Sequence, residues 1–219
     1  MNKFALGCVV VLVVLLFVAV FAALAISRSY NRLVNLQTDV DTKWADVQTQ
    51  YQRRMDLIPN LVNTVQGAAN FEKSTLVEVT NARASVGRVQ VQIDPNKAPT
   101  DQAQIDKFQA AQGELGNALS RLLVVVERYP ELKANQNFLT LQAQLEGTEN
   151  RIAVARRNFN ESVQTYNATV RRVPTNIVAS MLGFTQRPFF TAQTGAERPP
   201  PVQFNFGSPA PAAAATASP

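Results

Sequence analysis

Carboxylate and guanidinium side chains crowd one stretch of this sequence, residues 145–157. Glu146 and Glu149 lie about one helical turn apart, and Arg151 and Arg156 follow them. Paired carboxylates can bind a hard cation or exchange protons, and arginines bind anions. Two carboxylates one turn apart are nevertheless too common to identify a metal site. The stretch therefore predicts no metal, and its chemistry depends on what else the chain supplies.

The composition excludes most catalytic chemistry within these 219 residues. Histidine is absent, and the single cysteine, Cys8, lies inside an apolar run. Without them there is no Ser-His-Asp triad, Cys-His pair, histidine zinc site or intramolecular disulfide. We therefore predict no enzyme, no catalytic residue and no cofactor. A hydrolase that uses only carboxylates, at Glu127, Glu146 or Glu149, is the remaining enzymatic alternative, and it would need a deep polar pocket.

A structural interpretation of the charges competes with a functional one. The charged residues are matched in sign and follow helical spacing, so we interpret them as ion pairs that set the register of packed helices. The functional alternative is an anion-binding or partner-binding site. The candidate ion-pair cluster comprises Arg53, Asp56, Arg121, Glu127, Glu146, Glu149, Arg151 and Arg156.

The apolar run Phe4–Ile26 is unbroken, and no other stretch of the chain resembles it. At about 1.5 Å of helical rise per residue, it is long enough to cross a hydrocarbon core of roughly 30 Å. The length of the run disfavours a cleaved signal peptide, and Cys8 precedes the apolar stretch instead of following it, which disfavours a lipoprotein. We predict a single-pass membrane anchor over residues 1–28.

The net charge of +5 is spread thinly, with acidic residues interleaved among the basic ones. Nucleic-acid binding requires a denser basic patch with aromatic residues in it, so we predict no nucleic-acid partner. Arg28 and Arg32 follow the apolar run, where they can meet anionic lipid head groups. Because Lys3 flanks the other end, the positive-inside rule leaves the side of the soluble domain undecided.

Apolar residues recur with helical spacing from Ser29 to about Val91. Pro59 interrupts this region. Proline lacks an N–H and its ring clashes with the preceding turn, so we expect a kink or a break there. Asp56 would then be available to cap the restarted helix.

A polar loop with two prolines follows at residues 92–100. A second helix is predicted to begin after Asp101, as its N-cap, and to close at Pro130. Its inner face is an apolar stripe, and Gln112 is the one polar residue at a position of that stripe.

A third long helix is predicted over about residues 135–173, and a short one over 176–182 that ends at Gly183. Gly147, in the middle of the third helix, suggests close packing against a neighbouring helix. No segment alternates with the period of a strand for long enough to predict a sheet. Long helices joined by short loops therefore predict an all-α antiparallel bundle over residues 29–183.

The aromatic segment, residues 184–206, combines five phenylalanines with several prolines. We expect it to fold back as an extended strap on the bundle, and the alternative is that it docks a partner. The candidate docking residues are Phe184, Phe189, Phe190, Phe204 and Phe206. The remaining tail, residues 207–219, is rich in alanine and proline, which predicts disorder.

Several runs are more specific than helical periodicity requires: YQRRMDLIPNLV at 51–62, VTNARA at 79–84, LSRLLVVVERYP at 119–130 and LEGTENRIAVARR at 145–157. In this order, and together with the anchor, they resemble the LemA family of bacterial membrane proteins over roughly residues 4–206. The resemblance implies one N-terminal membrane helix, a helical-bundle domain and no established enzymatic activity. It also implies a location in the bacterial cell (inner) membrane.

Some members of the family belong to magnetosome membranes, and others are encoded beside a membrane metalloprotease. For the family, the short N-terminus has been proposed to lie outside the cell. We expect a scaffold or adaptor in the lipid bilayer, with a membrane or envelope protein as partner. The alternative is a lipid- or peptide-binding module that works with a membrane protease or an envelope-stress system. Homo-oligomerisation stays open, because nothing in the sequence decides it.

Overall fold

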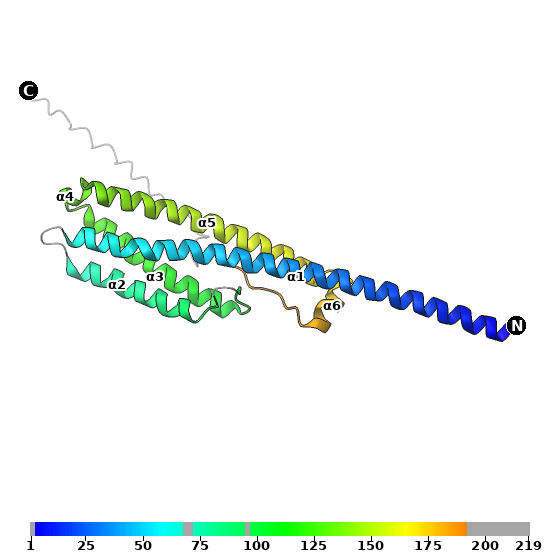
Figure 1. Ribbon diagram of the computed structural model, residues 1–219. Helices are drawn as coiled ribbons and strands as arrows, with labels where there is room; N and C mark the ends of the chain where they lie inside the picture. Colours follow the sequence, from blue (N-terminus) through cyan, green and yellow to red (C-terminus); the bar gives the residue numbers. More distant parts are fainter. Residues whose placement is uncertain (1–2, 68–71, 95–96, 192–219) are drawn as a thin grey trace, which may run out of the picture.

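The computed structural model describes residues 3–67, 72–94 and 97–191 (Figure 1). Its helices are α1 (Lys3–Gln66), α2 (Lys73–Val91), α3 (Gln102–Val126), α4 (Pro130–Lys133), α5 (Gln136–Arg171) and α6 (Thr175–Leu182). The described ranges contain no strand, and the predicted all-α class is confirmed. The predicted tail, 207–219, lies outside the described residues.

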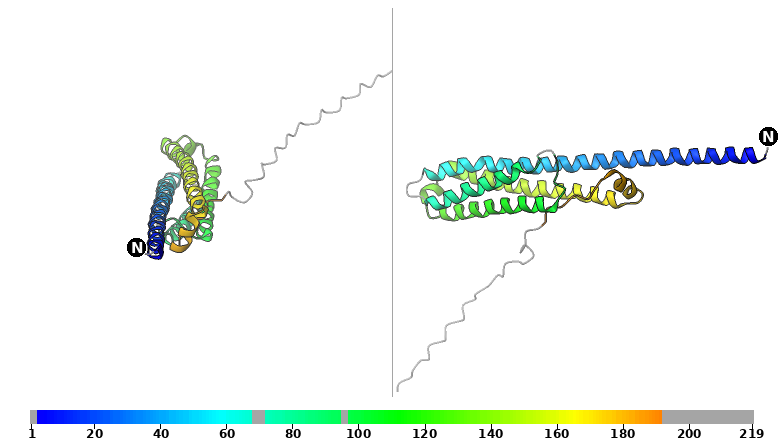
Figure 2. Two further views of the ribbon diagram at one scale, coloured as in Figure 1. Left: turned by 90° about the vertical axis from the view of Figure 1, so that its right-hand side faces the viewer. Right: turned by 90° about the horizontal axis from the view of Figure 1, so that it is seen from below.

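The bundle is elongated and consists of two antiparallel helix pairs that run alongside each other (Figure 1). α1 packs against α5, and α2 packs against α3. The N-terminal part of α1 continues beyond the other helices as a single projecting helix (Figure 1, Figure 2). Successive long helices alternate in direction because the connections between them are short, as expected of an antiparallel bundle.

The projecting part of α1 carries the apolar run. Its large apolar side chains from Val11 to Ile26 are exposed. By length and composition, α1 is the one helix of the described chain that could cross a membrane. Apolar surface left in water costs about 25 cal/mol per Å², so the environment that matches this part of the helix is a bilayer.

Two clusters of buried apolar side chains hold the helix pairs together. The aromatic cluster surrounds Trp44, whose ring centre lies 5.5 Å from that of Phe108 and 5.6 Å from that of Phe159. Tyr51 meets Phe108 edge to face at 4.9 Å. Rings at these separations attract one another beyond the surface that they bury. The second cluster is mainly aliphatic, includes Leu115 and fills the end of the bundle farther from the projecting helix.

The helix ends carry caps that the sequence predicts. The Asp101 carboxylate accepts a hydrogen bond from the backbone N–H of Ala103 at 3.0 Å and caps α3. Asn135, which was not predicted as a cap, caps α5 in the same way. Gly183 ends α6 with a φ of 76°, a left-handed conformation that glycine adopts at little cost.

Pro59 lies inside α1 and does not end it, so, of the kink or break expected at this residue, the break is wrong. The first helix instead ends at Gln66, and the next begins at Lys73, at a place where the sequence analysis predicted no interruption. Asp56 caps no restarted helix. Its carboxylate accepts a hydrogen bond from the side-chain amide of Gln52 at 2.8 Å.

A side chain from α2 explains how α1 passes through Pro59. Because proline has no N–H, the carbonyl of Met55, four residues earlier, loses its helical donor. Arg83 Nε lies 3.3 Å from that carbonyl oxygen and donates to it. The neighbouring helix thus satisfies a polar group in a buried residue that would otherwise favour a break.

We expect Arg83→Ala to lower the free energy of unfolding by about 1–3 kcal/mol, because the Met55 carbonyl is left unpaired. In a Pro59→Ala background, the N–H of Ala at position 59 should donate to the Met55 carbonyl. Arg83→Ala should then lower the free energy of unfolding by clearly less. Chemical denaturation in detergent micelles measures the four proteins of this cycle. Arg88→Ala, at an exposed arginine of α2, is the control. Equal costs of Arg83→Ala in both backgrounds would contradict the explanation.

Candidate functional site: a polar groove between α3 and α5

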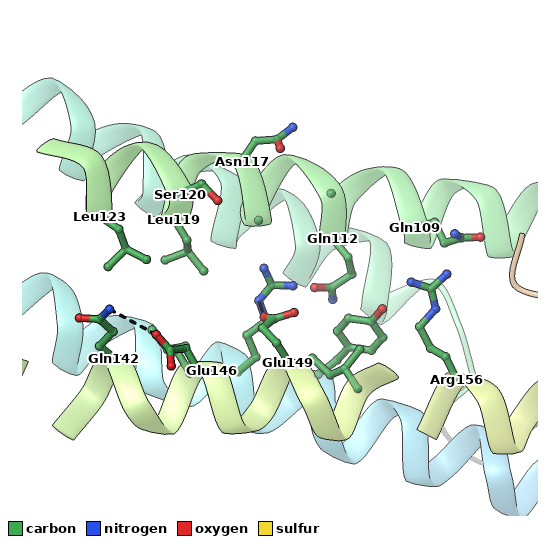
Figure 3. Close-up of a pocket in the computed structure, with 16 residues that line it drawn as sticks. Gln109, Gln112, Asn117, Leu119, Ser120, Leu123, Gln142, Glu146, Glu149 and Arg156 are labelled. Atoms are coloured by element: carbon green, nitrogen blue, oxygen red, sulfur yellow. Dashed lines mark hydrogen bonds and ion pairs between the residues drawn. The ribbon is translucent and has the colours of Figure 1, made fainter. Parts of the chain in front are cut away.

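A groove of about 380 Å³, lined by both polar and apolar side chains, opens between α3 and α5, and α1 contributes to its floor (Figure 3). The residues that α3 contributes include the small side chains of Gly113, Gly116 and Ser120. A Cβ atom on Gly116 would lie 3.1 Å from Nη2 of Arg54, closer than an ordinary contact. Glycine at this position therefore makes room for the guanidinium in the groove.

Arg54 of α1 places a buried positive charge at the floor of the groove. Its Nε lies 2.9 Å from Oε1 of Glu149 on α5, whose side chain is half exposed. The N–H does not point at that oxygen, so the contact is an ion pair without a well-aligned hydrogen bond. Removing a guanidinium from water is costly, and attraction to a half-exposed carboxylate offsets only part of that cost.

Gln112 projects from α3 toward α5 (Figure 3). The residue is only 4% exposed, and neither its Nε2 nor its Oε1 has a hydrogen-bond partner among the described residues. An amide buried without partners costs about 1–3 kcal/mol. The wall of the groove therefore holds an amide whose nitrogen and oxygen are both buried and have no partner among the described residues.

Tyr51 lines the groove where the groove meets the aromatic cluster. Burial raises the pKa of its hydroxyl, and the nearby guanidiniums of Arg156 and Arg54 oppose that rise. The phenol is therefore a neutral group at physiological pH, able both to donate and to accept a hydrogen bond.

The chain after α6 returns along α5 as an extended strap, residues Phe184–Thr191, which ends at the groove. The Thr191 carbonyl accepts hydrogen bonds from Gln109 Nε2 at 2.9 Å and from Arg156 at 3.3 Å. Both donors also line the groove. The Arg156 guanidinium lies 4.7 Å from the centre of the Phe190 ring, in a cation–π contact.

Two asparagines of α5, seven residues apart, bind the backbone of the strap. Asn160 accepts from the N–H of Phe190 and donates to its carbonyl, both at 2.9 Å. Asn167 forms the same pair of hydrogen bonds with Arg187, both at 2.8 Å. Side-chain amides thus supply the hydrogen bonds that extended backbone would otherwise form with a neighbouring strand.

The phenylalanines of the aromatic segment have different environments. Phe190 is buried in the aromatic cluster, and its ring centre lies 5.9 Å from that of Trp44. Phe184 is half-buried and meets Tyr30 at 6.0 Å. Phe189 is exposed. Phe204 and Phe206 lie outside the described residues.

The eight charged residues predicted as an ion-pair cluster take part in separate contacts and do not form one network. Glu149 pairs with Arg54, a residue that the prediction did not include. Three others have partners outside the set: Arg121 with Glu78, Glu127 with Lys133, and Asp56 with Gln52.

The remaining four charged residues divide between two surfaces. Glu146 and Arg156 line the groove. Arg53 and Arg151 line a separate hollow between α1 and α5, together with Gly147. A Cβ atom on Gly147 would meet nothing within 4 Å, so the expected close packing at this glycine is wrong. Helical spacing indicates which residues share a face, but not which helix that face meets.

The groups in the groove are suited to binding. The groove offers an ion pair between a buried guanidinium and a half-exposed carboxylate, an unpaired amide and a phenol, around a space open to solvent. Over the ranges that the structure describes, no three His, Cys, Asp or Glu side chains are grouped to hold a metal ion. The arrangement can hold a polar ligand through hydrogen bonds. Gln112 was visible in the sequence only as a polar residue in an apolar stripe.

Comparisons with known proteins agree with the sequence resemblance. The sequence model of the LemA family matches residues 43–204, which include the groove and the strap. Magnetosome protein MamQ 2 of Paramagnetospirillum magneticum is 27% identical over 197 residues, covering 84% of this chain and 72% of that protein. Magnetosome protein MamQ of Magnetospirillum gryphiswaldense is 27% identical over 183 residues, covering 78% and 67%. Protein LemA of Metamycoplasma hominis is 25% identical over 182 residues, covering 83% and 77%.

Two adjacent phenylalanines test how the strap is held. Phe190 is 5% exposed and Phe189 is 37% exposed. Phe190→Ala should lower the free energy of unfolding by about 3–5 kcal/mol, because it leaves a cavity inside the aromatic cluster. Phe189→Ala, the matched control, should cost less than about 1 kcal/mol. Denaturation of both variants in detergent measures the difference, and equal costs would show that Phe190 does not anchor the strap.

Proposed function

Because the chain belongs to the LemA family, whose model matches most of it, we propose that it is a membrane-anchored scaffold or adaptor with no reaction of its own. In this proposal, the apolar part of α1 crosses the bacterial cell (inner) membrane once. The bundle then holds a partner polypeptide in the groove between α3 and α5.

The anchor is supported by the exposed apolar side chains of α1 and by the names of the proteins to which the chain is similar. The apolar surface from Val11 to Ile26 has no covering from the described parts of the bundle. Two of the relatives are named as magnetosome proteins and one as LemA, and none of these names describes a reaction.

The unpaired amide of Gln112 is the observation that carries the binding role. A buried donor and acceptor without partners lower the stability of the bundle. An apolar side chain at position 112 would complete the apolar face of α3 without burying an unpaired amide. Their presence is explained if the Gln112 side chain turns toward the groove when another molecule binds there and supplies the missing hydrogen bonds.

An extended polypeptide is the ligand class that fits this amide best. A peptide unit offers one N–H and one C=O, which complement the two free atoms of Gln112. Asn160 and Asn167 bind the strap in this way on the same face of α5. The groove continues the line of the strap, because Gln109 and Arg156 contact both.

The second candidate function is a peptide-binding module that delivers its ligand to a membrane protease or an envelope-stress system. It uses the same groove and differs in the identity of the partner. The groove has a mixed lining, but the buried charge of Arg54 and the unpaired amide of Gln112 favour a peptide over a lipid acyl chain.

Gln112→Leu separates stability from binding. We expect this variant to keep its stability or to gain up to about 1–3 kcal/mol, because leucine removes a buried amide that has no partner. Gln142→Leu is the control. The Gln142 amide donates to Glu146 at 3.3 Å, so its loss should bring no gain. Thermal and chemical denaturation in detergent compare the two variants.

Binding is tested by photo-crosslinking in native membranes. A photoactivatable side chain at Ser120, inside the groove, should give a discrete adduct with a partner polypeptide. Gln112→Leu should remove that adduct while the protein stays folded. The same probe at Val124, one turn farther along α3 and outside the groove, is the control. An adduct that survives Gln112→Leu, or that forms equally from Val124, would contradict the proposal.

A further inference from the structure

α6 lies beside α1 at the place where the apolar run leaves the bundle (Figure 1, Figure 2). Ala179 of α6 is buried in the same apolar cluster as Leu33 of α1. Just after α6, the ring of Phe184 lies 6.0 Å from that of Tyr30. These contacts hold α6 within a few residues of Ile26, where the apolar run ends.

The outer surface of α6 and of the turn before it is apolar and exposed. Val173, Ile177, Met181 and Leu182 are all more than half exposed, and the exposure of Met181 reaches 76%. Ile177 and Met181 are one turn apart, so their side chains share a face of the helix. Four large apolar residues within ten positions form a patch, which isolated surface residues do not. No described residue covers it.

The charges at this end of the molecule are all positive. The stretches 3–38 and 162–191 contain no aspartate or glutamate. The exposed basic side chains closest to the end of the apolar run and to α6 are those of Arg28, Arg32, Arg171 and Arg172. Apolar side chains bordered by basic ones are typical of helices that lie in the interface of an anionic membrane.

We infer that α6 is a second membrane contact, which rests on the bilayer surface with its exposed apolar side chains at the boundary between head groups and acyl chains. The inference depends on the proposed anchoring through α1. It goes beyond that proposal because it assigns a lipid-binding surface to the bundle itself. The lipid surface is the occupant that the structure supports, because the patch adjoins the point where α1 enters the bilayer. The arginines there match anionic head groups in charge.

Spin labels on the full-length chain test the immersion of α6. Cys8→Ser removes the only cysteine, and a nitroxide is then attached at Met181→Cys or, as a second site, at Ile177→Cys. The protein is reconstituted in phosphatidylcholine vesicles with and without phosphatidylglycerol. Oxygen concentrates in lipid, whereas a water-soluble nickel chelate stays outside it. The ratio of their collision rates with the label therefore reports its depth.

Two reference positions calibrate this measurement. Leu16→Cys lies in the apolar run and marks the bilayer interior. Val91→Cys is the matched aqueous control, because Val91 is an apolar residue that is 88% exposed and lies beside a hollow shared with Gln48. The 22 residues of α1 from Ile26 to Gln48 correspond to about 33 Å, so Val91 is far from the bilayer.

The oxygen-to-nickel ratio at Met181 and Ile177 should exceed that at Val91, approach that at Leu16 and increase with phosphatidylglycerol. A ratio at Met181 equal to that at Val91, with Leu16 immersed, would overturn the inference and leave the anchor intact. Low collision rates with both reagents would also overturn it, because they would show that protein, such as a second copy of the chain, covers the patch. An aqueous signal from Leu16 itself would refute the anchor and the inference together.

Discussion

One continuous helix sets the geometry of this molecule. α1 begins as an apolar segment with no covering from the bundle and continues, without a break, as the longest helix of that bundle. It passes Pro59 because Arg83 of α2 donates the hydrogen bond that proline cannot. The 28 residues from Ile26 to Arg54 correspond to about 42 Å of helix. The same chain that forms the anchor thus also sets the distance from the membrane to the groove.

The groove opens between the two helix pairs, and members of both apolar clusters line it. Rings around Trp44 bridge the helices on one side of it, and aliphatic side chains around Leu115 bridge them on the other. Between them lie the buried guanidinium of Arg54 and the unpaired amide of Gln112, which both reduce stability. Polar groups of this kind within an otherwise apolar interior are expected where a protein binds something else.

The local features of the fold could be predicted from the sequence, because they depend on neighbours along the chain. The caps at Asp101 and Gly183 and the helical class are of this kind. The continuity of α1 could not be predicted, because it depends on a hydrogen bond between helices. Arg83 donates to the carbonyl of Met55, which is 28 positions away in the sequence. The end of α1 at Gln66 and the start of α2 at Lys73 were missed because apolar residues keep their helical spacing past Gln66.

The candidate site was predicted less well, for the same reason. The charges around Glu149 drew attention to the correct part of α5, but its partner, Arg54, was not among the predicted residues. Gln112 was recognised only as a polar residue in an apolar stripe. Its significance depends on the atoms around it, since an amide at that position could equally have been paired. Pairing between helices is a property of the packed structure and cannot be read from the spacing within one helix.

The continuity of α1 is the central claim, and a distance along it provides the most direct test. Nitroxide labels at Arg28→Cys and Asn63→Cys, in the Cys8→Ser protein in vesicles, lie on exposed positions on either side of Pro59. Pulsed electron resonance should give one narrow distance distribution centred at about 52 Å, the length of 35 residues of unbroken helix. A broad distribution, or one centred at a clearly shorter distance, would show that the helix bends or breaks and that the groove is not held at a fixed height above the membrane.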